Sequence, residues 1–185
     1  MRHHWLRRIT GRRATPVRAP ATPDDTGTDL VLAWIGDVTA GLANPPPGPP
    51  ESAAARSCDG LFTAAALSAV LIEKVDPRPE YRIANRYCLA AAIEFMKALG
   101  EETLRRYRIR AATPVGWERM TADLDERAIA AKMIQLGEAL QLTLCAVTID
   151  ATLTTDIRDV ADDFGLPAAA AIVDSFQTVL THPDS

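Results

Sequence analysis

The sequence predicts an all-α protein, a single-domain helical bundle of about six to seven helices with a flexible basic N-terminal arm. Apolar residues recur at three- and four-residue spacing along most of the chain after residue 28, as on one face of a helix. Aromatic residues make up only 5% of the chain while alanine is frequent, and this composition favours closely packed helices. The uncharged run Leu61–Ile72 is apolar on every side of a helical wheel, so other helices have to surround it.

Length and charge narrow the classes of function. With 185 residues, the chain is long enough for one domain with a sizeable core. The net charge is −4, but six arginines precede the first acid, Asp24, so the rest of the chain carries −10. An acidic body argues against a broad nucleic-acid-binding face, although a local basic patch remains possible.

The N-terminal arm, residues 1–28, combines arginine, threonine and proline with few apolar residues, which is typical of a segment without a packed core. Trp5, Leu6 and Ile9 fall on one side of a short basic helix, a pattern that suits an anionic membrane surface or nucleic acid. A solvated tail and an organelle targeting segment are the alternatives. Four arginines of the arm are candidate contacts to an anion or a partner: Arg7, Arg8, Arg12 and Arg13.

The body divides into a first helix at 29–43, a proline-rich linker at 44–50 and the bundle core at 51–182. Asp29 is a plausible N-cap for the first helix. Within the core, helices are expected at about 52–75, 80–99 and 123–149, and two shorter helices follow residue 155. Gly100 should end the helix at 80–99. The helices at 52–75 and 80–99 should form an antiparallel hairpin, and a charge at Ala65 or Ala69 should unfold the protein.

The helix at 80–99 carries a wide apolar seam that we expect to face the core. Leu89, Ala92, Ile93 and Met96 widen this seam. The three cysteines also lie in apolar helical contexts, where a thiol behaves as a small buried hydrophobe. The seam has this centre: Tyr81, Ala84, Cys88, Ala91, Phe95 and Leu99. The cysteines are Cys58, Cys88 and Cys145.

One basic patch stands out in the acidic body. Arg105, Arg106, Arg108 and Arg110 surround Tyr107 and Ile109, and guanidinium groups bind phosphates and carboxylates in a bidentate manner. We favour a helix followed by a loop here, although the alternation would also suit a strand. The four arginines are candidate contacts to an anion or a partner; pairing with acids of the body, or plain exposure to solvent, is the alternative.

Residues 157–167 resemble the first helix and turn of a bacterial helix-turn-helix, with Val160-Ala161 and then Gly165-Leu166 at the turn. A recognition helix presents polar or basic side chains to DNA. Here the following positions are Ala168 to Ala171, and the preceding helix is acidic. The unit at 154–181 is therefore a degenerate version of this motif, and DNA binding by it is an alternative rather than the first expectation.

Catalytic chemistry has little support in the sequence. The histidines His3, His4 and His182 are not spaced to bind a metal or to serve a nucleophile. Glu94 and Glu138 are the acids most embedded in apolar helix, and facing each other inside the bundle they would form an acid–base pair. More often such residues face outward. We expect no catalytic residues, cofactor or metal.

The first hypothesis is thus a cytoplasmic, non-catalytic interaction or adaptor protein that binds a protein partner or itself, with basic segments making an anionic contact. A DNA-associated regulator using 154–181 is one alternative. A small-molecule-binding bundle or enzyme, with a pocket among the helices at 52–75, 80–99 and 123–149, is another. Membrane surface contact by the arm is compatible with the sequence, whereas the run Leu61–Ile72 is too short to span a bilayer, so no transmembrane segment is expected.

Overall fold

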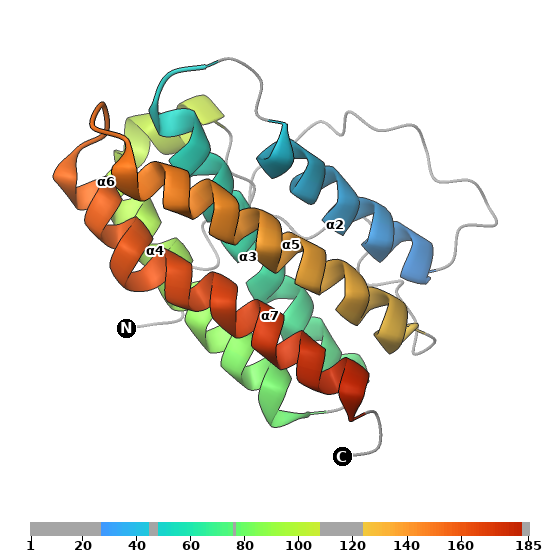
Figure 1. The fold of residues 1–185 in the computed structure, drawn as a ribbon. Helices are drawn as coiled ribbons and strands as arrows, with labels where there is room; N and C mark the ends of the chain where they lie inside the picture. Colours follow the sequence, from blue (N-terminus) through green and yellow to red (C-terminus); the bar gives the residue numbers. More distant parts are fainter. Residues whose placement is uncertain (1–26, 45–47, 76, 108–123, 183–185) are drawn as a thin grey trace.

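Helix α3, Glu51–Lys74, lies at the centre of the structure, and the other helices pack around it (Figure 1). The computed structural model describes residues 27–44, 48–75, 77–107 and 124–182. This part is 89% helical and contains five helices and no strand, so the predicted all-α class is confirmed. The other helices are α2 (Gly27–Ala43), α4 (Pro79–Tyr107), α5 (Glu126–Ile149) and a continuous helix made of α6 (Thr155–Val160), η2 (Ala161–Gly165) and α7 (Leu166–Thr181).

The N-terminal arm, most of the proline run and residues 108–123 lie outside the described residues. The count of six to seven helices and the arm are therefore not addressed by this part of the chain. Within it, the expected bounds of the first helix and of the helix at 52–75 hold to within two residues. Asp29, however, lies inside the first turn of α2 rather than at its N-cap, because the helix already begins at Gly27.

The predicted hairpin of α3 and α4 forms the most extensive helix pair of the fold. Alanines on both helices allow a close approach, since Ala64 and Ala92 are fully buried. Two side chains bridge the pair: the Cys58 thiol donates to the Ala92 carbonyl at 3.5 Å, and Asn85 Nδ2 donates to the Ala65 carbonyl at 2.7 Å. Covering of α3 is not complete, because Ala69 is exposed. The expectation that a charge at Ala69 unfolds the protein is therefore wrong, while Ala65 is only 4% exposed.

Helix ends follow local sequence chemistry. Asp125 caps α5 by accepting a hydrogen bond from the Ala128 N–H at 2.9 Å, as a carboxylate at an N-cap does. At the other end of α5, Asp150 Oδ1 accepts from the Thr152 hydroxyl at 2.6 Å and from its N–H at 2.9 Å, and these bonds lower the pKa of Asp150. Gly100 has φ 73° and breaks α4, as predicted, and a second helical piece continues to Tyr107, in line with the helix expected around Arg105 and Arg106.

Residues 155–181 form one continuous helix, so the helix-turn-helix prediction for 154–181 is wrong. The chain does not turn at Gly165; it widens into a π-helical segment in which the Leu166 N–H donates to the Ala161 carbonyl. Pro167 gives the physical reason, because its ring clashes with a carbonyl one turn back and its nitrogen has no proton to donate. Gly165 fits there because it is pressed against α5: a Cβ at this position would lie 2.8 Å from Leu144 Cδ2.

A polar cluster joins four segments at one end of the bundle. Arg78, 9% exposed, has its Nε 3.5 Å from Glu126 Oε1, and its Nη1 donates to the His182 carbonyl at 3.1 Å. The Tyr81 hydroxyl also donates to Glu126. This cluster connects the α3–α4 loop to the start of α5 and the end of α7, so it fixes the relative positions of these elements.

Two helices, Glu51–Lys74 and Thr155–Thr181, are long and apolar enough to cross a membrane by length and composition alone. The sequence prediction counted only the run Leu61–Ile72 and missed that the whole helix passes this test. The most apolar window of Glu51–Lys74 is 67% buried inside the bundle and that of Thr155–Thr181 is 39% buried. Packing against other helices thus accounts for the apolar character of α3.

Candidate functional site

The predicted arginine contacts are only partly within the described residues. Arg105 and Arg106 lie in the last turn of α4, exposed, and each pairs one turn back along its own helix, with Glu101 and Glu102 respectively. Because α4 extends to Tyr107, the segment is helical at residues 105–107. Exposed pairs of this kind contribute little to stability. The other candidates lie outside the described residues: Arg108, Arg110, Arg7, Arg8, Arg12 and Arg13.

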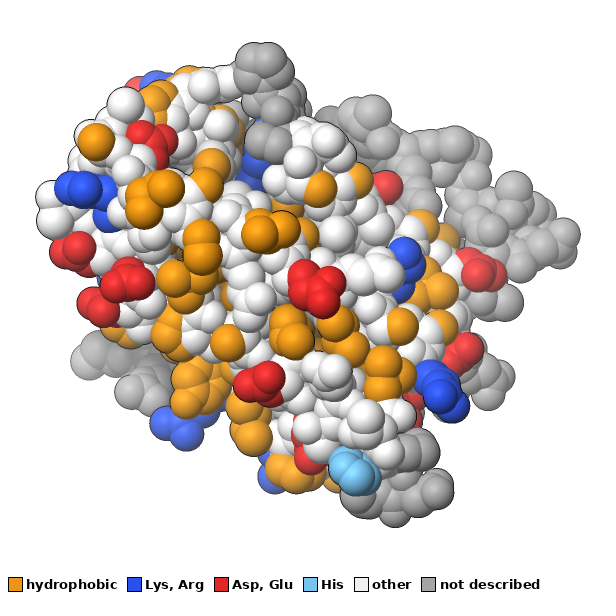
Figure 2. Space-filling view, viewed as in Figure 1, with side chains coloured by type: hydrophobic (Ala, Val, Ile, Leu, Met, Phe, Trp, Pro, Cys, Tyr) orange, Lys and Arg blue, Asp and Glu red, His pale blue; other side chains and the backbone are white. Residues whose placement is uncertain are grey.

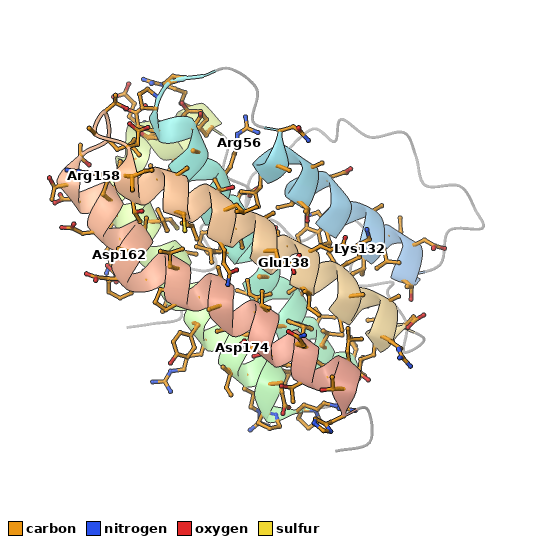
Figure 3. The ribbon with its side chains drawn as sticks, in the orientation of Figure 1. Arg56, Lys132, Glu138, Arg158, Asp162 and Asp174 are labelled. Carbon is orange, nitrogen blue, oxygen red and sulfur yellow. The ribbon has the colours of Figure 1, made fainter. Side chains whose placement is uncertain are left out.

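The two acids considered for catalysis are separated by the fold. Glu94 lies on α4 and its Oε1 is 2.6 Å from Lys97 Nζ, an ordinary surface pair. Glu138 is exposed on the outer side of α5 (Figure 3). Because the acids do not face each other, the structure does not bring together the acid–base pair. The described residues also hold no cluster of three or more His, Cys, Asp or Glu side chains suited to a metal ion.

Two of the three cysteines are buried as predicted. Burial raises the pKa values of the Cys58 and Cys88 thiols, with the carboxylate of Asp59 adding to the effect at Cys58. Neutral thiols are poor nucleophiles, so these two are packing residues. Cys145 is exposed on α5, which corrects the expectation that all three are buried.

The feature that stands out is an apolar outer face on α4. Ile83 is 47% exposed, Tyr87 50%, Leu89 36% and Ile93 42%. No other helix in the described part of the chain exposes as many large apolar side chains. We call these four residues, together with Ala90 between them, the α4 face. A concentration of exposed large apolar side chains on one element commonly marks a binding site.

The sequence interpretation misassigned this face. Leu89 and Ile93 were expected to widen the core seam, but α4 contacts α3 and α7 on one side only, and that side is already filled by the centre of the seam. A signal was present in the sequence, because apolar residues on α4 cover more of the helix circumference than one buried face requires. The other two residues expected to widen the seam do face the core: Ala92 is fully buried and Met96 is partly buried.

A groove adjoins the α4 face where α4 runs beside α7. It encloses about 460 Å³ and is open to solvent. Ile83 and Tyr87 form its α4 wall, and small residues of α7, Ala170 and Ala171, allow the depression because they do not fill the space between the helices. Glu80 and Asp174 line the same groove, so it has an apolar centre with carboxylates beside it. This groove does not lie among α3, α4 and α5, where a pocket was expected.

Charged side chains of both signs lie near the α4 face, and the acids include Glu80 and Asp174 of the adjoining groove. Arg82 and Arg86 are exposed near its N-terminal end and Lys97 near its C-terminal end. Neither the Arg82 nor the Arg86 guanidinium makes a hydrogen bond or ion pair with another described residue. An apolar patch with charged side chains beside it is a usual composition of a protein–protein interface.

Helix α5 exposes a second, smaller apolar set. Leu142 is 76% exposed and Ile149 82%, with Cys145 between them. In the space-filling view, apolar atoms on the surface formed by α5 and α7 are interrupted by isolated acids (Figure 2); Glu138 and Asp174 are two of these (Figure 3). This set has only two large side chains, fewer than the α4 face, so it provides a control surface.

Comparison of the chain with protein-family models, with curated protein sequences and with solved structures gave no match.

Proposed function

We propose that the protein is a non-catalytic interaction protein that binds another polypeptide through the α4 face and the adjoining α4–α7 groove. The single observation that carries this proposal is the concentration of exposed large apolar side chains on one side of α4, next to a groove of matching character. The proposal moves the contact surface away from the arginines of residues 105–110, because the two of these within the described residues are paired with acids of their own helix.

The energetics suit reversible rather than permanent binding. Fully burying a side chain of this size stabilises by about 1.5–3 kcal/mol, and Ile83 and Tyr87 are already half-covered in the free protein. Each therefore contributes roughly half of that range when a partner covers it. Tyr87 is the natural anchor, since tyrosine combines a large apolar ring with a hydroxyl that hydrogen-bonds at the edge of an interface.

DNA binding by residues 154–181 gains no support from the fold, because the turn on which that hypothesis depended is absent from the continuous helix 155–181. A basic contact by residues 1–28 remains compatible with the proposal. Its motivation is the sequence alone, namely four arginines beside Trp5, Leu6 and Ile9.

The test uses one substituted surface and one matched control. The double variant Ile83→Ser/Ile93→Ser removes two large apolar groups from the α4 face, and Leu142→Ser/Ile149→Ser removes two from α5. Each purified protein is immobilised and used to capture polypeptides from extracts of the source cells, with quantification by mass spectrometry. We expect at least one polypeptide to be bound by wild type and by the α5 variant and lost with the α4 variant. Identical captured sets for wild type and the α4 variant would contradict the proposal.

A further inference from the structure

We propose that the polypeptide bound by the α4 face is a second copy of this chain, and that two α4 helices pair antiparallel about a two-fold axis that passes beside Ala90. This inference rests on the proposed function, since it names the partner of the same surface. The observation behind it is that the residues three and four positions before Ala90 on the exposed side of α4 are complementary to those three and four positions after it.

Helical spacing defines which residues would meet. In a two-fold antiparallel pair centred on one residue, positions at equal distances before and after the centre face each other across the interface. Tyr87 and Ile93 are each three residues from Ala90, on opposite sides, and Arg86 and Glu94 are each four residues from it. Tyr87 of one copy would therefore pack on Ile93 of the other, and Arg86 would face Glu94 of the other copy.

The charges favour this arrangement. Arg86 is exposed and has no ion-pair partner among the described residues, while Glu94 Oε1 holds Lys97 of its own helix at 2.6 Å. A carboxylate has two oxygens and accepts from two cations. Glu94 can thus keep Lys97 and receive Arg86 of the other copy. By symmetry the interface contains this pairing twice.

The size of the central residue also favours this register. Ala90 is exposed and stands at the point of closest approach, where a small side chain lets two helices come within the usual 8–10 Å of each other. Neighbouring registers are less favourable. Centring the pair on Arg86 would place the two guanidinium groups against each other. Moving the centre midway between Leu89 and Ala90 would place Arg82 opposite Lys97.

A heterologous partner would need no such symmetry. An apolar strip for a different protein could carry charges of one sign, or charges in any order, whereas this strip has a cation and an acid at matched distances from a small central residue. Self-association also explains why the apolar side chains remain exposed in the single chain. Since one helix face provides less area than the roughly 800 Å² per partner of a standard interface, the pair should form reversibly with concentration.

Charge reversal gives a specific test, with sedimentation equilibrium of the full chain as the measurement. Wild type should show a monomer–dimer equilibrium. Arg86→Glu and Glu94→Arg should each raise the dissociation constant about tenfold or more, because each places like charges opposite each other twice. A mixture of the two single variants should associate about as well as wild type, since every facing pair is then again of opposite sign. Circular dichroism melting of each variant checks that the fold is retained.

Arg127→Glu, the same change of charge on α5, serves as the control and should leave the equilibrium unchanged. Failure of the mixed single variants to associate more tightly than either variant alone would overturn the register. A wild-type chain that stays monomeric at all concentrations would overturn self-pairing, yet the capture experiment above would still show whether the α4 face binds a different polypeptide. If, in addition, the α4 variant lost no captured polypeptide, the proposed function would be overturned as well.

Discussion

Helices α3 and α4 lie side by side, yet the large apolar side chains of α3 are buried whereas several of those of α4 are exposed to solvent. In α3, Leu61, Leu67 and Leu71 are at most 1% exposed, and the helix is covered on nearly all sides. Helix α4 contains many more charged residues, but four of its large apolar side chains face solvent. The difference teaches that hydrophobicity summed along a helix identifies core, whereas a functional surface is found where apolar residues exceed what the core can cover.

The sharpest way to break this comparison is a charge on α3. Ala65→Asp places a carboxylate at a position that is 4% exposed and packed beside α4, and a buried unpaired charge costs about 3–5 kcal/mol. We expect the free energy of unfolding, measured by urea denaturation, to fall by about that amount or the chain not to fold. Ala69→Asp is the matched control one turn further on: it faces solvent, so a change below about 1 kcal/mol is expected. Equal losses for both variants would show that α3 is covered on all sides.

A smaller change in stability is expected when a methyl group is added at a packed glycine and at an unpacked one. Gly137→Ala places a Cβ 2.8 Å from Val173 Cγ2 and 3.2 Å from the backbone oxygen of Ala169, so α5 and α7 must separate, at a cost of about 1–3 kcal/mol. Gly36→Ala meets nothing within 4 Å on α2 and should stabilise by about 0.5–1 kcal/mol, because alanine is the better helix former. Thermal unfolding followed by circular dichroism gives both signs. A shift in the same direction for both variants would contradict the packing of α5 on α7.

The smallest expected change in stability concerns the α4 face itself. Ile83→Ser removes a side chain that is 47% exposed, so the unfolding free energy of the isolated chain should change by less than about 1 kcal/mol. The measurement has to be made at a concentration where the chain is monomeric, because association stabilises by mass action. A drop of several kcal/mol under those conditions would mean that α4 is covered there and that its exposed face is part of the core.

Much of the bundle could be predicted from sequence because its signals are local. The run Leu61–Ile72, apolar on every side of a helical wheel, predicted a central helix. The bounds of α5 followed from its regular apolar spacing and from the acids at its start. Gly100 was expected to interrupt α4. Each of these depends on residues close together in the chain, and helix periodicity and capping act over exactly that range of sequence. Local chemistry therefore determined the class of the fold and most helix bounds.

The tertiary structure decided what the local signals left open. The sequence of α4 shows two possible apolar sides, and only the packing of α3 and α7 against one of them leaves Ile83, Tyr87 and Ile93 outside. Similarly, Gly165 and Pro167 are typical of a turn, but the chain continues through them as a widened helix in which Gly165 lies against Leu144 of α5. Burial is a property of neighbours that are distant in the chain, so the candidate site, which consists of what remains uncovered, became visible only once the helices were assembled.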